Sequence, residues 1–234
     1  MDPNQAQKTK DYEMIENSVP SYPSEDPQWL EKGRWLFAQK IDFMQGASSM
    51  ETLPPEGLNE IAFVGRSNVG KSSLINAITN HKSLARVSHT PGRTQELNFF
   101  SLSTYGVLVD LPGYGYAKAS KTKVAAWNQL IHDYLQGRVT LRRVYVLVDS
   151  RHGIKNNDIE IFELLDEYAL SFQVVLTKID KVKEPDLPKI LKSTTDKIKK
   201  YTPAHPKVLM TSSVKKSGME SLWGEIAALC LPHD

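Results

Sequence analysis

Five short apolar runs, each followed by a longer segment of helical periodicity, restrict this chain to few folds. The runs are Ile61–Val64, Val107–Val109, Val144–Val148, Val174–Leu176 and Val208–Met210. Apolar runs of this length without alternation are typical of strands that are buried on both faces of a parallel sheet. Strand then helix, five times over, predicts an α/β fold with a mostly parallel, doubly wound sheet and helices on both of its faces.

The segments between these runs carry apolar residues at helical spacing. We expect helices over residues 71–80, 124–136, 156–169, 187–200 and 219–231. In the third segment Ile159, Phe162 and Leu165 fall on one side, as they do in a helix that covers a core. The stretch Leu97–Leu102, just before the second run, predicts one further antiparallel strand at an edge of the sheet.

The length of 234 residues exceeds one domain of common size by little, so we expect one domain with an N-terminal addition. Residues 1–28 hold four prolines, six acidic residues and two lysines, a net charge of −4, and this composition predicts a flexible arm. Aromatic and apolar residues return over residues 29–57, which we expect to pack on the body and link to it. The body itself is expected to span residues 58–234.

Composition excludes several classes of protein. The single cysteine, Cys230, excludes an intramolecular disulfide framework, and the six histidines show no spacing with it that suits zinc. No run approaches the roughly 20 apolar residues of a membrane span, and the first residues lack the pattern of a secretory signal. We expect a soluble, cytoplasmic protein with no membrane contact and an inert thiol at Cys230.

A glycine-rich motif stands between the first apolar run and the first helical segment. Residues Gly65–Ser72 read GRSNVGKS and fit the pattern G-x-x-x-x-G-K-[ST]. In this context backbone N–H groups converge on phosphate oxygens, and the helix start adds its dipole. We expect Lys71 to neutralise the β- and γ-phosphates and the Ser72 hydroxyl to bind Mg²⁺. An ordinary glycine-rich turn has similar letters but does not explain the flanking strand and helix.

A second motif, D-x-x-G, closes the second apolar run at Asp110–Gly113. A carboxylate at this end of a parallel strand is placed to reach a phosphate-bound metal through water, and the N–H of Gly113 is placed to reach the γ-phosphate. Alone, the motif has the same letters as an ordinary turn that begins with Asp. Its value comes from following a phosphate-binding loop.

A third motif, T-K-x-D, ends the fourth run at Thr177–Asp180. The Asp180 carboxylate can accept hydrogen bonds from both N1–H and N2–H₂ of guanine, a pair of donors that adenine lacks, and such a reader discriminates well. The alkyl stem of Lys178 can lie along the base, and the turn Thr211–Ser213 after the fifth run can give an N–H to the guanine carbonyl. The order of the three motifs favours guanine over adenine.

Longer stretches around these motifs resemble the EngB family of bacterial ribosome-assembly GTPases, within the translation-factor-like branch of P-loop GTPases. The stretches are Gly65–Ser73, Lys82–Arg86 leading to Thr90–Gln95, Asp110–Tyr116, Val148–His152 and Ser212–Gly218. The similarity covers roughly residues 58–231. It implies a Ras-like G domain that binds GTP and GDP with Mg²⁺ and hydrolyses GTP.

The resemblance also implies roles for single residues. Thr94 matches the switch I threonine that binds Mg²⁺, with Thr90 as the alternative. Tyr114 stands where many small GTPases carry a glutamine that orients the attacking water, so we expect slow intrinsic hydrolysis. Asn68 matches the asparagine that holds K⁺ beside the phosphates in potassium-dependent relatives, and a cap within the loop is the other reading of this residue.

The candidate site is therefore specific by residue. The catalytic candidates are Lys71, Thr94, Asn68 and Gly113, and the Mg²⁺ candidates are Ser72 and Thr94 directly and Asp110 through water. The candidates for nucleotide binding are Gly65, Arg66, Ser67, Asn68, Val69, Gly70, Lys71, Ser72, Gly92, Arg93, Thr94, Gln95, Glu96, Asp110, Leu111, Pro112, Gly113, Thr177, Lys178, Ile179, Asp180, Thr211, Ser212 and Ser213.

Basic residues are unevenly distributed along the chain. Residues 61–95 hold five basic residues and no acid, residues 117–143 hold six against one, and residues 181–216 hold ten lysines against three acids. Such surfaces suit the phosphates of rRNA, although lysine-rich solvated helices have the same composition. The resemblance implies a precursor of the large ribosomal subunit, its rRNA and ribosomal proteins, as the partner, and it implies a link to cell division and septation.

Two other functions stay open at this point. One is a GTP-dependent scaffold that binds RNA or the ribosome with negligible turnover. The other is a small-molecule kinase, which would need an adenine pocket where the chain carries Thr177–Asp180. We expect a monomer that does not bind DNA.

Overall fold

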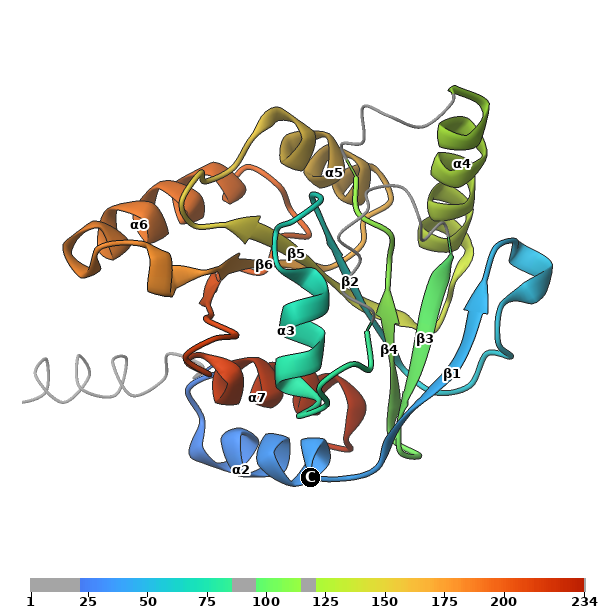
Figure 1. The fold of residues 1–234 in the computed structure, drawn as a ribbon, viewed down its shortest axis with the longest axis horizontal. Coiled ribbons are helices and arrows are strands. Elements are labelled where there is room, and N and C mark those ends of the chain that lie inside the picture. Colours follow the sequence, from blue (N-terminus) through green and yellow to red (C-terminus); the bar gives the residue numbers. More distant parts are fainter. Residues whose placement is uncertain (1–21, 86–95, 115–120, 234) are drawn as a thin grey trace, which may run out of the picture.

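The computed structural model describes residues 22–85, 96–114 and 121–233. Within these ranges a seven-stranded sheet with the order β1-β3-β4-β2-β5-β6-β7 forms the centre of the molecule (Figure 1). The strands are β1 (Ile41–Ala47), β2 (Glu60–Gly65), β3 (Leu97–Leu102), β4 (Gly106–Asp110), β5 (Leu141–Asp149), β6 (Phe172–Thr177) and β7 (Leu209–Met210). From β4 to β7 the neighbouring strands are parallel, whereas β1 and β3 are antiparallel to their neighbours.

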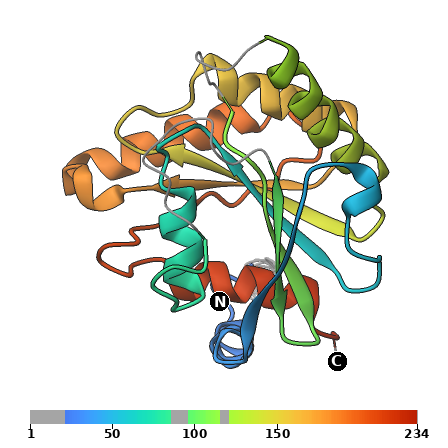
Figure 2. The same cartoon turned by 45° about the vertical axis from the view of Figure 1, so that its right-hand side comes forward.

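Helices cover both faces of the sheet, as the alternation of strands and helices predicts. Figure 2 shows the sheet between a layer of α4, α5 and α6 and a layer of α2, α3 and α7. The helices are α2 (Pro27–Phe37), α3 (Lys71–Ile78), α4 (Lys121–Gly137), α5 (Asn156–Glu167), α6 (Leu187–Ile198) and α7 (Met219–Cys230), with short 3₁₀ turns at Met50–Thr52, Ile179–Lys181 and Glu184–Asp186. The expected α/β fold is confirmed.

Strand β2 shows why continuous apolar runs belong to a sheet covered on both faces. Ile61 and Phe63 belong to the core beside α3 and α7, whereas Ala62 and Val64 belong to the core beneath α4 and α5. All six residues of the strand are buried. Because successive side chains of a strand point to opposite faces, both sets of positions must be apolar here.

The predicted strands and helices are present, with ends that differ from the prediction by at most three residues. Leu97–Leu102 is antiparallel to β4, as expected, but the prediction that it forms the edge is wrong. Strand β1 lies outside it and pairs with it from Ile41 opposite Leu102 to Ala47 opposite Leu97, with a bulge between Phe43 and Gln45.

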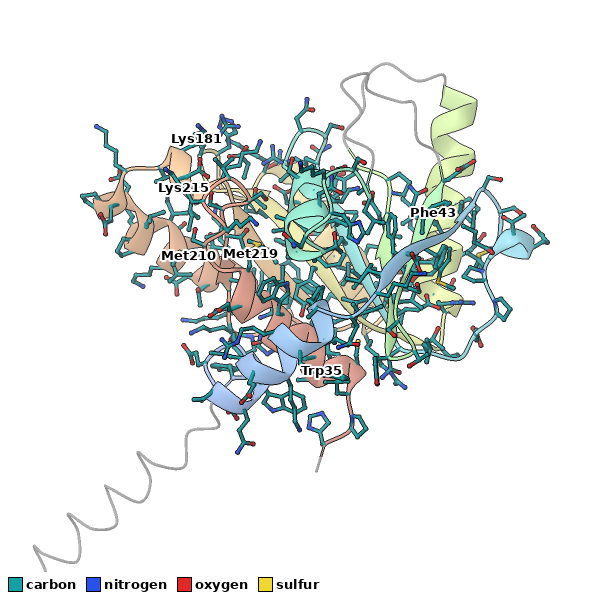
Figure 3. The ribbon with its side chains drawn as sticks, turned by 60° about the horizontal axis from the view of Figure 1, so that its bottom comes forward. Trp35, Phe43, Lys181, Met210, Lys215 and Met219 are labelled. Atoms are coloured by element: carbon teal, nitrogen blue, oxygen red, sulfur yellow. The ribbon has the colours of Figure 1, made fainter. Side chains whose placement is uncertain are left out.

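The segment before β2 is built into the body. Helix α2 packs on α7 closely, because a Cβ atom at Gly33 would lie 2.6 Å from the carbonyl carbon of Trp223. The N–H of Ser24 donates to Oε1 of the buried Glu225 at 3.3 Å. The ring of Phe43, which Figure 3 labels on β1, packs edge-on against the ring of Phe100. The division of the chain at residue 58 stays a prediction, and residues 1–21 of the acidic arm lie outside the described residues.

The helices in the described ranges are all too short or too polar to cross a lipid bilayer.

Candidate nucleotide-binding site

The phosphate-binding motif forms the connection between β2 and α3. Gly65 ends the strand, and Gly70 precedes the helix with φ 105°, a backbone conformation that favours glycine. Asn68 is also left-handed, with φ 62°. A Cβ atom at Gly65 would lie 2.8 Å from Cγ1 of Val69, so the loop folds tightly back over its first residue. Both glycines of the motif are therefore required by the geometry of the turn.

The end of β6 holds this loop in place. The Thr177 hydroxyl donates to the carbonyl oxygen of Val69 at 2.7 Å. The Lys178 ammonium donates to the carbonyl oxygen of Asn68 and, at 2.9 Å, to Oδ2 of Asp149. Two residues of the expected base-reading motif thus fix the backbone of the expected phosphate loop, and the two motifs form one site.

Asp149, the last residue of β5, belongs to the candidate site, although the sequence analysis gave it no role beyond its place in the family-like stretch Val148–His152. Its buried carboxylate accepts hydrogen bonds from Nζ of Lys178 and from Nε and Nη2 of Arg151, at 2.7–2.9 Å. Burial alone would raise the pKa of Asp149, but the bonds from Arg151 and Lys178 outweigh it and hold the pKa well below its usual range. The signal in the sequence was an acid at the end of an apolar run, the same signal that identified Asp110.

The expected guanine reader lies at the ends of two neighbouring parallel strands. The Ser212 hydroxyl after β7 donates to Oδ1 of Asp180 after β6 at 2.5 Å, and this bond holds the pKa of Asp180 below its ordinary value. The hydroxyl in turn accepts from the N–H of Lys215 at 3.1 Å. Figure 3 shows Lys181 and Lys215 at this same end of the molecule. The group expected to bind guanine is therefore an ionised carboxylate with lysines nearby.

The phosphate side of the site carries an ion pair between Lys71 and Asp110. Both side chains are largely buried. Asp110 is the last residue of β4, and Lys71 is the first residue of α3, which follows β2. The hydroxyl of Ser67 is buried and has no hydrogen-bond partner among the described residues. An unpaired hydroxyl in a glycine-rich loop that leads into Lys71 suits a phosphate oxygen.

Oxygen donors are also available for the expected Mg²⁺. Ser72 offers a hydroxyl at the first turn of α3, and Asp110 offers a carboxylate at the end of β4. Mg²⁺ prefers oxygen ligands and commonly takes one or two from the protein and the rest from phosphates and water. The donors of this chain therefore fit a metal that is shared with a nucleotide.

The D-x-x-G motif lies directly against the phosphate loop. A Cβ atom at Gly113 would lie 3.2 Å from the carbonyl oxygen of Gly65 and 3.4 Å from the backbone nitrogen of Ser67. Tyr114 continues this contact through its backbone, since its N–H donates to Gly65 and its carbonyl oxygen accepts from Ser67, both at 3.3 Å. Only glycine allows the approach at position 113 without a shift of the loop.

The side chain of Tyr114 is directed into the protein. Its hydroxyl is buried and donates to Oδ1 of Asp158 in α5 at 2.7 Å. Burial and the neighbouring carboxylate raise the pKa of Tyr114 far above its ordinary value, so the phenol stays protonated. The residue at the position of the water-orienting glutamine is therefore engaged elsewhere.

The structure thus brings together the expected residues of the phosphate loop, D-x-x-G, T-K-x-D and the following turn. Leu111, the second residue of D-x-x-G, is fully buried in the core beneath α4 and α5, and Ile179 packs against the same core. Glu96 lies beside β1, where a Cβ atom at Gly46 would lie 2.5 Å from Oε2 of its carboxylate. Gly92, Arg93, Thr94, Gln95 and the alternative Thr90 lie outside the described residues.

Two family models match the chain. The model described as "50S ribosome-binding GTPase" matches residues 60–178, and the model described as "Elongation factor Tu GTP binding domain" matches residues 134–232. The chain is similar to the probable GTP-binding protein EngB of Sinorhizobium fredii, with 57% identity over 196 residues, which is 80% of this chain and 90% of the relative. The corresponding protein of Rhodospirillum rubrum is 52% identical over 208 residues, 87% of this chain and 90% of the relative.

Solved structures share the fold at lower identity. A crystal structure of a probable GTP-binding protein EngB has a TM-score of 0.58 and 21% identity, covering 73% of this chain and 98% of that one. Era from Aquifex aeolicus, bound to GDP and AlF₄⁻, has a TM-score of 0.61 and 21% identity, covering 76% of this chain and 59% of that one. Together with the joined phosphate and base motifs, these matches show that the chain belongs to the EngB family of GTP-binding proteins and carries a P-loop GTPase domain.

Proposed function

We propose that this protein is a GTP-hydrolysing switch that acts on the large ribosomal subunit during its assembly. The observation that carries nucleotide binding is the position of Lys178, whose ammonium contacts the phosphate loop and Asp149 at once. The partner is supported by the family model, which is described as a 50S ribosome-binding GTPase. A fold neighbour, Era, has been solved with a GTP analogue, Mg²⁺ and a segment of 16S ribosomal RNA, which supports a ribosomal partner for this fold.

In the proposed complex each motif contacts one part of GTP. Asp180 accepts from the guanine edge, and Lys71 exchanges its Asp110 partner for oxygens of the β- and γ-phosphates. The N–H of Gly113 donates to the γ-phosphate, as does the cradle of N–H groups in the loop. Ser72 and Thr94 would hold Mg²⁺ directly and Asp110 would reach it through water, and the ion would supply positive charge to the phosphate oxygens.

We propose that intrinsic turnover is slow. The hydroxyl of Tyr114 is taken by Asp158, so this residue provides no group that orients the attacking water. The side-chain amide of Asn68 is exposed and has no partner among the described residues, which supports K⁺ as the ion that supplies charge beside the phosphates. The ribosomal precursor is the second candidate for acceleration.

The uneven distribution of basic residues supports rRNA as the main contact. Lys192 of α6 and Lys199 just after it both pair with Asp196, while Lys183, Lys189 and Lys197 form no ion pair among the described residues and add positive charge. The proposed protein is a cytoplasmic monomer without a role in DNA binding. Its link to cell division and septation then follows from the supply of ribosomes.

Two measurements test this proposal. Titration with mant-GDP and mant-ADP is expected to show strong preference for guanine, and single-turnover hydrolysis of GTP is expected to accelerate when large-subunit precursor or K⁺ is added. Lys71→Ala serves as the control that removes the phosphate contact. The scaffold alternative, supported by the engaged Tyr114, predicts that precursor affinity depends on GTP while hydrolysis stays negligible. Equal affinity for both mant-nucleotides, or equal binding of the precursor to the GDP and GTP forms, contradicts the switch.

A further inference from the structure

A buried carboxylate joins three parts of the nucleotide site that the motifs do not connect. Asp158 lies in the first turn of α5 and is fully buried. Its Oδ1 accepts from the Tyr114 hydroxyl at 2.7 Å and from Nε of Arg66 at 3.2 Å. Its Oδ2 accepts from the N–H of Lys155 at 2.8 Å. One side chain thus contacts the phosphate loop, the residue after D-x-x-G and the start of a helix.

The helix explains only half of these contacts. Oδ2 of Asp158 caps α5 by taking the N–H of Lys155, and this bond alone satisfies the local structure. The other oxygen is used for Arg66 and Tyr114, which lie on separate segments. A buried charge is costly unless it is paired and hydrogen-bonded, so these partners act as a set.

Gly113 is held by separate contacts on both of its sides, and the Asp158 set provides those that follow it. Before Gly113, β4 ends at Asp110, whose carboxylate pairs with Lys71. After it, the Tyr114 backbone is bonded to the phosphate loop, and the Tyr114 side chain is bonded to Asp158. Gly113 is therefore held against Ser67 before any ligand contact is made.

We propose that Asp158 and Tyr114 are positioning residues that preset the N–H of Gly113 for the γ-phosphate and so favour the triphosphate over the diphosphate. The inference rests on the proposed binding of GTP. Without the hydrogen bond between Tyr114 and Asp158, Gly113 must be ordered during binding. This loss of preorganisation weakens the binding only of a ligand that carries a γ-phosphate. GDP does not contact Gly113 and is unaffected.

The chain contains a matched control for the hydrogen bond between Tyr114 and Asp158. The Tyr134 hydroxyl donates to Oε2 of the buried Glu60 at 2.7 Å, and Nε of Arg138 donates to Oε1 of the same carboxylate at 2.7 Å. This set has the same three groups as Tyr114, Asp158 and Arg66. It lies at the first residue of β2, whereas the phosphate loop follows the last residue of that strand. Tyr134→Phe therefore removes an equivalent bond far from the nucleotide.

The test compares full-length Tyr114→Phe and Tyr134→Phe with the wild type by titration with mant-GDP and mant-GMPPNP. For Tyr114→Phe we expect the Kd of mant-GMPPNP to rise about tenfold, the usual effect of one hydrogen bond to a charged group, and the Kd of mant-GDP to stay unchanged. For Tyr134→Phe we expect the ratio of the two Kd values to equal that of the wild type. Unchanged mant-GDP binding also shows that the variant is folded.

The results separate this inference from the proposed function. A wild-type protein that binds neither mant-nucleotide contradicts GTP binding itself. A wild-type protein that binds both, with an equal ratio for wild type and Tyr114→Phe, contradicts only the positioning role. If Tyr114→Phe does not bind mant-GDP, Asp158→Asn keeps the shape of the side chain and removes its charge. A loss confined to mant-GMPPNP in that variant supports the proposal, and an equal loss for both nucleotides overturns it.

Discussion

The substitution Asp180→Asn tests the base-reading assignment most directly. Oδ1 of Asp180 is already bonded to Ser212 at 2.5 Å, so the carboxylate is oriented before a base arrives. In the proposed complex this group accepts from two donors on the guanine edge. In the variant an amide NH₂ replaces one acceptor oxygen and faces a donor of guanine.

The expected magnitude follows from these contacts. The loss of one charge-assisted hydrogen bond costs about 2 kcal/mol, and the unpaired donor adds about 1 kcal/mol. The sum, about 3 kcal/mol, corresponds to a roughly hundredfold increase in the Kd of mant-GDP. Xanthine carries a carbonyl at C2 in place of the amino group, so the new amide of Asp180→Asn can donate to it, and the Kd of mant-XDP should fall.

Titrations of wild type and variant with mant-GDP and mant-XDP measure both effects. Asp186→Asn, at an exposed acid near the same turn, is the control for the change in charge. Unchanged mant-GDP affinity refutes the assignment of Asp180. An equal loss for both nucleotides in Asp180→Asn shows damage to the site in place of altered base reading, and it refutes the reasoning as well.

Three further predictions concern pH, packing and the thiol. Ser212 holds the pKa of Asp180 below the ordinary value of an aspartate. The carboxylate is therefore fully ionised above that ordinary pKa, and its contribution to binding is lost only when the pH falls through the lowered pKa. The ratio of mant-GDP Kd values for Asp180→Asn and wild type should be constant from about pH 5.5 to about pH 8, and a falling ratio in that range contradicts this prediction. Gly33→Ala places a Cβ 2.6 Å from the Trp223 backbone and should destabilise the protein by about 2 kcal/mol, which lowers Tm by about 6 °C. Gly137→Ala, whose Cβ would meet no atom within 4 Å, is the control. Equal Tm values for the two variants contradict the packing argument. Burial raises the pKa of Cys230 to about 12, so iodoacetamide should label the native protein roughly a thousandfold more slowly than the unfolded one, and fast labelling of native protein disproves it.

The regular part of the fold was predictable because burial on both faces imposes a simple pattern. Strands β2, β4, β5 and β6 are covered by helices on each side, so each contains an uninterrupted run of buried apolar residues. Strand β1 obeys no such rule. It is an edge strand with a bulge, its residues Asp42–Met44 are exposed, and its pairing depends on the distant β3. Nothing local in its sequence distinguishes it from a loop.

The candidate site was predictable where a motif places a side chain at the end of a strand. Lys71, Asp110, Thr177 and Asp180 lie where parallel strands bring them together. The contacts among them were not predictable, because they join residues far apart in sequence. Asp158 illustrates this: in the sequence it is one acid on the polar side of a helix, and only the fold places it beneath Tyr114.

The packing of α2 on α7 has a consequence for the way this chain is made. The bond from Ser24 to Glu225 joins residues 201 positions apart, and the buried side chains Leu36 and Phe37 share a core with Leu222 of α7. During synthesis α2 leaves the ribosome before the sheet exists, while its partner α7 is the last of the described helices to be translated. The apolar face of α2 stays uncovered, and prone to wrong contacts, until α7 has been made. Of the helices described, the first to be synthesised is the one that must wait longest for its partner.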